Sequence, residues 1–303
     1  MIMYKKEKEI LIVAIDHGFC TIKTPTEVFD NGVQKLETAP AFTEKTLYYE
    51  GSYYKVGEGR LSMKNEKTED DDYFILTLAA IACEMDRYQL EYANVVIAAG
   101  LPFGRFGAEK EDFKNYLKRG LVLFDFNGKH YTCRIVDVKL FPQCYAAVAS
   151  RLGNMAPEQL IVDIGSKTID VVHTKNHRPV ERECFSIPEA LIACTRQVEN
   201  AVYNQLNRHI PEEQIQKVMM TGKCSYAEKY LNVMKKQLRI FAEQVEGKLK
   251  ENGFDPDITP IIYCGGGAVV MKLYGRTHGS HIGYMEDVRA NAMGYEYITE
   301  KMI

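Results

Sequence analysis

The sequence predicts an α/β protein made of two related domains with a cleft between them. Its 303 residues exceed what one small core needs and suit two domains of typical size. Buried strands alternate with helical segments along the chain. One pattern occurs twice, at residues 10–24 and 160–174: a buried strand that ends in Asp-x-Gly, followed by a returning strand. The repeat predicts two domains of related topology.

The composition disfavours several classes of protein. Hydrophobic residues at 46% and charged residues at 26% are typical of a folded globular chain, and the formal net charge of -3 disfavours direct binding to nucleic acid. The eight cysteines include no Cys-x-x-Cys pair, which indicates buried thiols in a reducing compartment, so we expect a cytoplasmic protein. No segment reaches the roughly 20 apolar residues of a membrane helix. We therefore expect no membrane partner.

The segments between and around the repeated pattern alternate strands with helices. In the first half we expect a hairpin of residues 46–49 and 53–56, an exposed acidic loop at 66–72, helices at 74–87, 110–119 and 143–152, a strand at 95–99 and two strands around Asn127-Gly128. In the second half we expect helices at 188–209, 212–220, 225–252 and 287–300, and a buried strand at 261–264. These elements predict one domain from residues 1–153 and 286–303 and a second from residues 154–285.

The first copy of the pattern, DHGFCTIK at residues 16–23, has the composition of a phosphate-binding hairpin. Backbone N–H groups of such a turn can hold phosphate oxygens, and Gly18 lets a ligand approach the backbone. Lys23 can neutralise phosphate charge, and Asp16 can hold Mg²⁺ through water. An isolated Asp-x-Gly between strands is usually only a turn, so this motif alone is a weak signal.

The second copy, DIGSKTID at residues 163–170, makes the signal far more specific. Two such hairpins, one in each domain, can clamp the phosphates of a nucleotide between them. The glycines at residues 265–267 follow a buried strand and open a helix, so their backbone can lie against a purine or ribose, although a tight strand-to-helix turn would look the same. Gln143 can orient an attacking water, or can simply cap a helix.

Together these motifs resemble those of the actin-like ATPases, which have an actin-like (ribonuclease H-like) fold. Residues 16–23 and 163–170 look like the two phosphate motifs, residues 142–147 and 291–295 like the two connecting helices, and residues 265–268 like the adenosine motif. Their order and spacing cover the whole chain. The sequences AGLP at residues 99–102 and RANAMGY at 289–295 look most like the plasmid-segregation branch, the ParM or StbA type.

The resemblance implies a role for each matching residue. Asp16 would coordinate Mg²⁺ through water, and Gln143 and Asp163 would orient and activate the water that attacks the γ-phosphate. The residues that would contact the nucleotide are Gly18, Phe19, Cys20, Thr21 and Lys23 in the first hairpin, Gly165, Ser166, Lys167, Thr168 and Asp170 in the second, and Gly265, Gly266 and Gly267 at the adenosine. Asp170 would support the second hairpin or the metal shell. Ser166 and Lys167 depart from the family's glycine-rich pair, so Lys167 either adds charge at the γ-phosphate or points to solvent.

The leading hypothesis is an ATPase, using ATP or GTP with Mg²⁺, that polymerises into filaments with copies of itself. In the resembled branch, such filaments segregate plasmid DNA through an adaptor protein of ParR type, so contact with DNA is indirect. The acidic balance of this chain agrees with that. The alternative is a small-molecule kinase of the same superfamily, acting on a sugar or acid, in which a carboxylate would serve as base toward the acceptor hydroxyl. No acceptor-binding motif is evident in the sequence.

Overall fold

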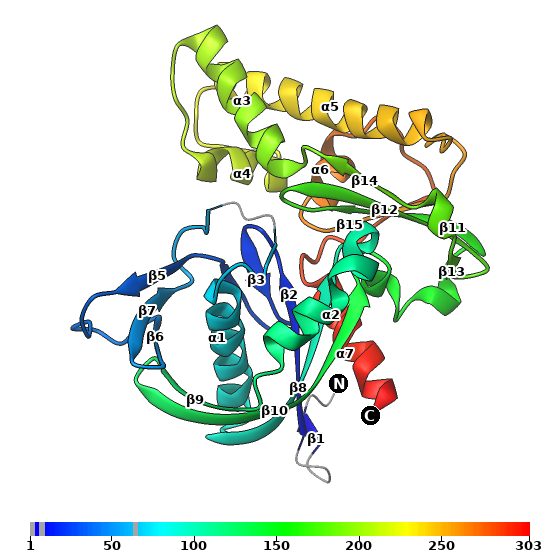
Figure 1. The fold of residues 1–303 in the computed structure, drawn as a ribbon. Coiled ribbons are helices and arrows are strands. Elements are labelled where there is room, and N and C mark those ends of the chain that lie inside the picture. Colours follow the sequence, from blue (N-terminus) through cyan, green and yellow to red (C-terminus); the bar gives the residue numbers. More distant parts are fainter. Residues whose placement is uncertain (1–3, 6–9, 63–65) are drawn as a thin grey trace. The chain divides into compact units, whose positions relative to one another are not determined.

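The computed structural model describes residues 4–5, 10–62 and 66–303 (Figure 1). The chain divides into two compact units, Met1–Ser150 with Arg289–Ile303 (unit 1) and Arg151–Val288 (unit 2). Each unit has a mixed sheet and a hydrophobic core of its own. The assignment of residues 1–153 with 286–303 and of residues 154–285 to two domains with separate roles stays a prediction.

The described strands of unit 1 form one sheet whose centre is parallel. The strands are β1 (Tyr4–Lys5), β2 (Ile10–His17), β3 (Thr21–Lys23), β4 (Val28–Asp30), β5 (Val33–Leu36), β6 (Thr46–Tyr49), β7 (Ser52–Val56), β8 (Tyr92–Leu101), β9 (Leu121–Phe126) and β10 (Lys129–Pro142). Their order is β4-β3-β2-β8-β10-β9-β6-β7-β5, with β1 paired to β2. β2, β8 and β10 are parallel, and β2 and β8 are buried along most of their length, which explains their continuous apolar runs.

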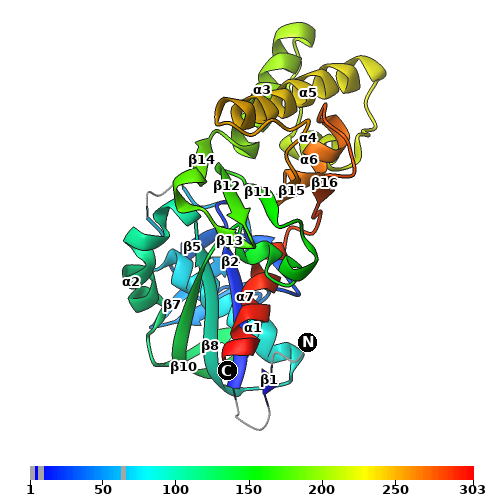
Figure 2. The same ribbon diagram turned by 90° about the vertical axis from the view of Figure 1, so that its right-hand side faces the viewer.

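Helices cover both faces of this sheet (Figure 2). They are α1 (Asp72–Arg87), α2 (Phe106–Leu117) and α7 (Ala290–Met302). Because successive side chains of a strand point to opposite faces, Val13 and Ile15 of β2 join the core with α1 and α2, whereas Ile12 and Ala14 pack with Tyr295 of α7. This packing fixes the end of β2, where the first predicted hairpin begins.

The helix expected at residues 143–152 is absent, and that prediction is wrong. β10 continues to Pro142, and two short 3₁₀ turns follow at Ala146–Val148 and Leu152–Asn154. Cys144 has a left-handed backbone with φ of 68°, which a regular α-helix cannot contain. Its N–H donates to Oδ1 of Asn291, at 3.0 Å, so a side chain of α7 satisfies the backbone group that a helix would have used.

Gly294 of α7 lies directly against the turn at Ala146, and this contact supports a prediction about stability. A Cβ at residue 294 would lie 1.9 Å from the carbonyl oxygen of Ala146. We expect Gly294→Ala to lower the free energy of unfolding by about 3 kcal/mol, because backbone on both sides must move apart. Gly247→Ala is the matched control, since nothing lies near Gly247 within α5, and we expect it to stabilise by about 0.5–1 kcal/mol. Urea unfolding measures both, and equal effects would contradict the packing described.

Unit 2 has a smaller mixed sheet with four helices among its described residues. Its strands are β11 (Glu158–Ile164), β12 (Thr168–Lys175), β13 (Arg178–Pro179), β14 (Phe185–Pro188), β15 (Ile261–Cys264) and β16 (Ile282–Tyr284), in the order β13-β12-β11-β15-β16, with β14 also paired to β12. Its helices are α3 (Leu191–Leu206), α4 (Glu212–Thr221), α5 (Glu228–Glu251) and α6 (Ala268–Tyr274). Residues from these helices and from β11, β12 and β15 form the core of this unit.

Candidate nucleotide site

The two predicted hairpins have the same geometry, each within its own unit. β2 pairs with β3 so that Asp16 lies opposite Lys23, and β11 pairs with β12 so that Asp163 lies opposite Asp170, which is the same offset of seven residues. In both turns, the N–H of the glycine donates to the carbonyl oxygen of the threonine three residues later, at 3.1 Å from Gly18 to Thr21 and 3.0 Å from Gly165 to Thr168. The repeat in the sequence is therefore a repeat in structure.

Three of the predicted site residues meet at Asp16, which is 5% exposed at the end of β2. The ammonium of Lys23 donates to Oδ2 of Asp16 at 3.2 Å. The amide nitrogen of Gln143 donates to Oδ1 at 3.0 Å. The backbone that follows β10 therefore holds Gln143 beside Asp16 although the predicted helix does not form.

Further contacts shape the turn of the first hairpin, which contains Gly18, Phe19, Cys20 and Thr21. A Cβ at residue 18 would lie 2.6 Å from the carbonyl oxygen of Thr21, so only glycine fits there. The side-chain amide of Asn31 donates to the carbonyl oxygen of Phe19 at 3.0 Å, and the N–H of Asn31 donates to that of Cys20 at 3.0 Å. Asn31 is buried and was not predicted from the sequence, since a lone asparagine between strands has no distinctive signal.

In the second hairpin, the structure ties Asp170 to its own strands. Thr168 Oγ1 donates to Oδ2 of Asp170 at 3.1 Å, and the hydroxyl of Ser186 in β14 donates to Oδ1. Ser186 lies opposite Asp170 in the β12–β14 pairing. Both oxygens of Asp170 thus hold the hairpin and the neighbouring strand together, which favours the supporting role among the two alternatives considered for this residue.

Ser166 and Lys167, which replace the family's glycine-rich pair, contribute backbone hydrogen bonds to the start of α3. The carbonyl oxygen of Ser166 accepts from the N–H of Ile192 at 2.9 Å, and that of Lys167 accepts from the N–H of Ala190 at 3.3 Å. The turn therefore binds N–H groups at the start of α3, which otherwise lack partners inside the helix. These hydrogen bonds fix the backbone on which both side chains are mounted.

The glycines at residues 265–267 lie against the end of β11. Gly265 has φ of 74°, and a Cβ there would lie 2.2 Å from Oδ1 of Asp163. A Cβ at Gly267 would lie 2.1 Å from Cγ2 of Ile164, whereas Gly266 is less crowded. Unit 2 thus brings Asp163 and the three glycines together. Gly265 and Gly267 are required for this packing because neither position has room for a Cβ.

Behind the first hairpin lies His17, which is fully buried and neutral. Thr77 Oγ1 donates to the carbonyl oxygen of Tyr73 at 2.7 Å, so it accepts from Nε2–H of His17 at 2.8 Å. Nδ1 is then a bare acceptor, and it has no hydrogen-bond partner among the described residues. Burial lowers the pKa of His17 well below its ordinary value, and the charges of Lys67 and Lys23 lower it further.

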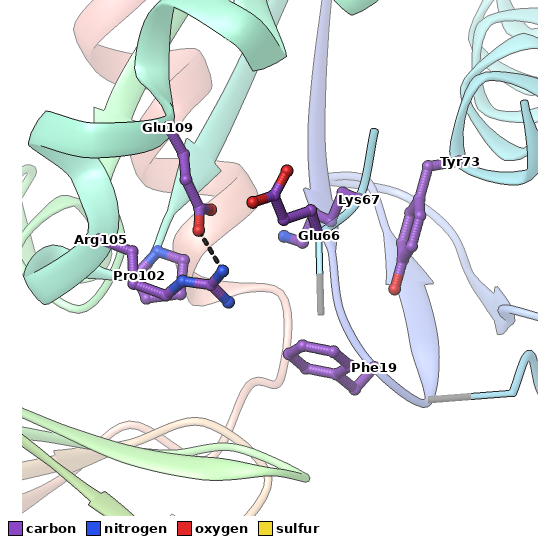
Figure 3. A pocket seen from close by; sticks show the side chains of 7 residues that line it. All are labelled: Phe19, Glu66, Lys67, Tyr73, Pro102, Arg105 and Glu109. Atoms are coloured by element: carbon purple, nitrogen blue, oxygen red, sulfur yellow. Dashed lines mark ion pairs between the residues drawn. The ribbon is translucent and has the colours of Figure 1, made fainter. Parts of the chain in front are cut away.

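A small pocket adjoins the same hairpin (Figure 3). Its lining residues come from the hairpin, the loop before α1, α1 itself, the β8–α2 connection and α2: Phe19, Glu66, Lys67, Tyr73, Pro102, Arg105 and Glu109. Lys67 is only 8% exposed, although the sequence predicts an exposed acidic loop at residues 66–72. That prediction is wrong for Lys67. The acidic residues around it suggest an exposed segment, whereas the side chain of Lys67 points inward.

The residues around Asp16 fit a magnesium ion bound through water. Each carboxylate oxygen of Asp16 accepts one hydrogen bond, Oδ2 from Lys23 and Oδ1 from Gln143, and keeps a further lone pair that a metal-bound water could use. This arrangement disfavours a site in which protein atoms alone coordinate the ion. The described part of the chain contains no cluster of three or more His, Cys, Asp or Glu residues able to hold a metal.

Among the described residues, no helix is long and apolar enough to cross a membrane.

Comparisons with known families match both units. A model described as the N-terminal domain of actin-like proteins matches residues 14–145, and one described as the C-terminal domain of archaeal MreB-like actin homologues matches residues 161–274. The chain belongs to the actin-like proteins. The two matched regions include Asp16, Gln143, Asp163 and the glycines at residues 265–267 of this actin-like protein. No curated protein matches the sequence.

Solved structures establish the actin-like fold, as the sequence predicts. A ParM from Clostridium botulinum, solved as a 15-stranded filament, is 18% identical with a TM-score of 0.71 over 96% of this chain and 99% of that one. An archaeal actin homologue in complex with ADP is 18% identical, with a TM-score of 0.72 over 96% and 99%. ParM from Bacillus thuringiensis with ATP is 12% identical, with a TM-score of 0.72 over 97% and 100%.

Proposed function

We propose that this actin-like protein is an ATPase that polymerises into nucleotide-dependent filaments and segregates plasmid DNA. The observation that carries the proposal is the pair of hairpins with one register and one turn hydrogen bond, at Asp16 and at Asp163. A single such turn would be unremarkable, but two in one chain of this family are what a phosphate clamp requires. Structural relatives bound to ADP and to ATP support nucleotide as the ligand.

The residues of unit 1 would bind phosphate and metal. Backbone N–H groups of the turn that follows Gly18 would face phosphate oxygens, since the N–H of Gly18 itself is engaged within the turn, and Lys23 would offset the phosphate charge. Mg²⁺, when bound through water at Asp16, would neutralise charge on the phosphates. The side-chain nitrogen of Gln143 donates to Oδ1 of Asp16 at 3.0 Å, so its side-chain oxygen, Oε1, would orient the attacking water.

The residues of unit 2 would supply the base and the adenosine surface. Asp163 is 8% exposed and lies at the end of a rigid buried strand, so its carboxylate is well positioned to accept a proton from water. Gly165 to Thr168 would cradle phosphate from this side. The glycines at residues 265–267 would lie against the base or ribose, where the absence of side chains leaves the backbone accessible.

The family and symmetry support filament assembly. The filament of the Clostridium botulinum relative supports self-association. A head-to-tail contact that does not close into a ring produces a filament. An adaptor of ParR type would connect the filament to DNA, since a net charge of -3 gives the chain no long-range attraction to phosphates of its own. The described cysteines are all free thiols, which supports the cytoplasm as the location.

Sedimentation of the purified protein tests this proposal. We expect the protein to pellet with Mg²⁺ and ATP and to stay in the supernatant without nucleotide, and a parallel tube with Mg²⁺ and GTP determines the base preference. Non-hydrolysable analogues of both nucleotides serve as controls, because they should give a pellet that persists. Absence of a pellet in every tube, together with phosphoryl transfer only when a sugar or acid acceptor is added, would contradict the proposal and favour a small-molecule kinase.

A further inference from the structure

Lys67 is a buried cation with no carboxylate partner among the described residues. Its ammonium lies over two aromatic rings instead, 5.9 Å from the centre of the Tyr73 ring and 5.6 Å from that of Phe113. Such cation–π contacts contribute about 1–2 kcal/mol, which is less than the cost of removing an ammonium from water. The burial of this one ammonium is therefore unfavourable by itself, which indicates that the charge of Lys67 has a function.

The same two rings also pack against His17, at the start of the first hairpin. The imidazole of His17 packs edge-on against Tyr73 at 6.1 Å and against Phe113 at 5.4 Å, so Lys67 and His17 share one aromatic support. His17 follows Asp16 directly in β2. The ammonium of Lys67 is therefore placed beside the phosphate hairpin, on elements that the sequence motif does not include: the loop before α1, α1 and α2.

The charges around Lys67 come from each element packed against it. Burial lowers the pKa of Lys67 to about 8; Asp16 of β2 and Glu109 of α2 oppose this shift, while Lys23 of β3 and Arg105 add to it. Arg105 and Glu109 form an ion pair with each other, so their charges largely cancel. Asp16 and Lys23 are likewise paired at 3.2 Å. Among these five side chains, Lys67 is the cation left without a paired carboxylate. Glu66 and Asp112 also lie beside Lys67, but both are exposed, so solvent screens their charges more strongly.

The space beside Lys67 argues against direct contact with a phosphate. On the side of Phe19 the pocket has a volume of about 10 Å³, which admits one water molecule at most. On the side of α2 a hollow of about 320 Å³ is large enough for an anion, but it is lined by Glu66, Glu109 and Asp112. The three negative charges in this hollow outnumber the two positive charges of Lys67 and Arg105, so the hollow repels an anion. Lys67 must act on a ligand through its charge and not by touching it.

We propose that Lys67 is a positioning residue for nucleotide binding, whose buried ammonium compensates the carboxylate of Asp16 and so leaves the charge of Lys23 available to the phosphates. Without Lys67, the side chains of Asp16 and Lys23 sum to zero, and the hairpin offers a phosphate only its backbone dipoles. With Lys67, the three side chains Asp16, Lys23 and Lys67 carry one net positive charge, in a buried setting where charges are weakly screened. The inference rests on nucleotide binding by the hairpin, as proposed above.

A ligand-charge series tests this proposal. Dissociation constants for ATP, ADP and AMP are measured without Mg²⁺ at pH 7.5 for the wild type, Lys67→Met, Lys67→Arg and Lys110→Met. Methionine fills the space of the lysine stem without a buried charge, and Lys110 is an exposed lysine on α2 that serves as the matched control. We expect Lys67→Met to weaken ATP about tenfold, ADP less and AMP about twofold or less, because the electrostatic effect scales with ligand charge.

A pH series adds a readout that a packing role would not move. An ammonium is present below its pKa and lost above it, so the affinity of the wild type for ATP should fall as the pH rises through about 8. Lys67→Arg should keep the affinity and lose this pH dependence, whereas Lys67→Met should be weak at every pH. Equal weakening of all three nucleotides, or unchanged affinity in Lys67→Met, would overturn the inference alone. Failure of the wild type to bind any nucleotide would overturn the proposed function and the inference together.

Discussion

Replacement of Asp163 by alanine is expected to slow phosphate release by about 100-fold or more while changing nucleotide affinity less than about threefold. Asp163 lies at the end of β11 with its Oδ1 beside Gly265, and the core of unit 2 holds its backbone in place. A carboxylate in this position supplies proton acceptance in the transition state and little binding energy in the ground state. The measurement is single-turnover phosphate release at saturating nucleotide, with affinity determined separately by calorimetry.

Asp163→Asn is the control that separates shape from charge. The amide fills the same space next to Gly265 and cannot act as a base, so it should be as slow as alanine and should bind nucleotide as tightly as the wild type. Filaments of both variants should form and persist, because assembly needs binding and disassembly needs hydrolysis. A loss of affinity in proportion to the loss of hydrolysis would contradict the role of Asp163 as a base.

Replacement of Asp16 by alanine is expected to remove the Mg²⁺-dependent part of nucleotide affinity, which we place at about 100-fold by analogy with the loss of an ion's supporting ligands. The wild type should bind nucleotide more tightly with Mg²⁺ than with EDTA, and the variant should bind equally in both. Asp163→Asn, tested alongside, should retain the full response to Mg²⁺. An unchanged Mg²⁺ response in Asp16→Ala would contradict the assignment of Asp16 to the metal.

Asp16→Ala also carries a cost in stability that must be measured with it. Lys23 is 16% exposed and would lose its partner, and the amide of Gln143 would lose its acceptor. Breaking such a pair by removing one member lowers the free energy of unfolding by about 3 kcal/mol. Binding experiments therefore belong at a temperature where urea unfolding shows the variant to be folded.

The hairpins could be predicted because their signal is local. A continuous apolar run that stops at Asp-x-Gly specifies a buried strand and a tight turn, and the returning strand follows within the next eight residues. The glycine-rich turn after β15 was predictable for the same reason, since Gly265 and Gly267 tolerate contacts that no other residue could make. A glycine in the sequence can therefore indicate a place where the fold brings two segments into close contact.

The remaining features depend on contacts between distant segments. Residues 143–152 have a helical composition, but Asn291, which follows almost 150 residues later, captures the N–H of Cys144 and favours the turn. Lys67 is buried against Tyr73 and Phe113, and nothing in the acidic sequence around it distinguishes it from an exposed lysine. β14 was missed because its burial alternates over only four residues and its pairing with β12 is long-range. Tertiary packing decides such positions, not local propensity.

The most direct test of the account is one reaction followed by two signals. Light scattering and phosphate release are recorded together after a limited amount of ATP is added to the wild-type protein with Mg²⁺. We predict that scattering rises at once, holds while ATP remains, and decays as phosphate accumulates, and that in Asp163→Asn it rises and does not decay. Phosphate release without any rise in scattering would contradict the central claim that nucleotide binding drives assembly.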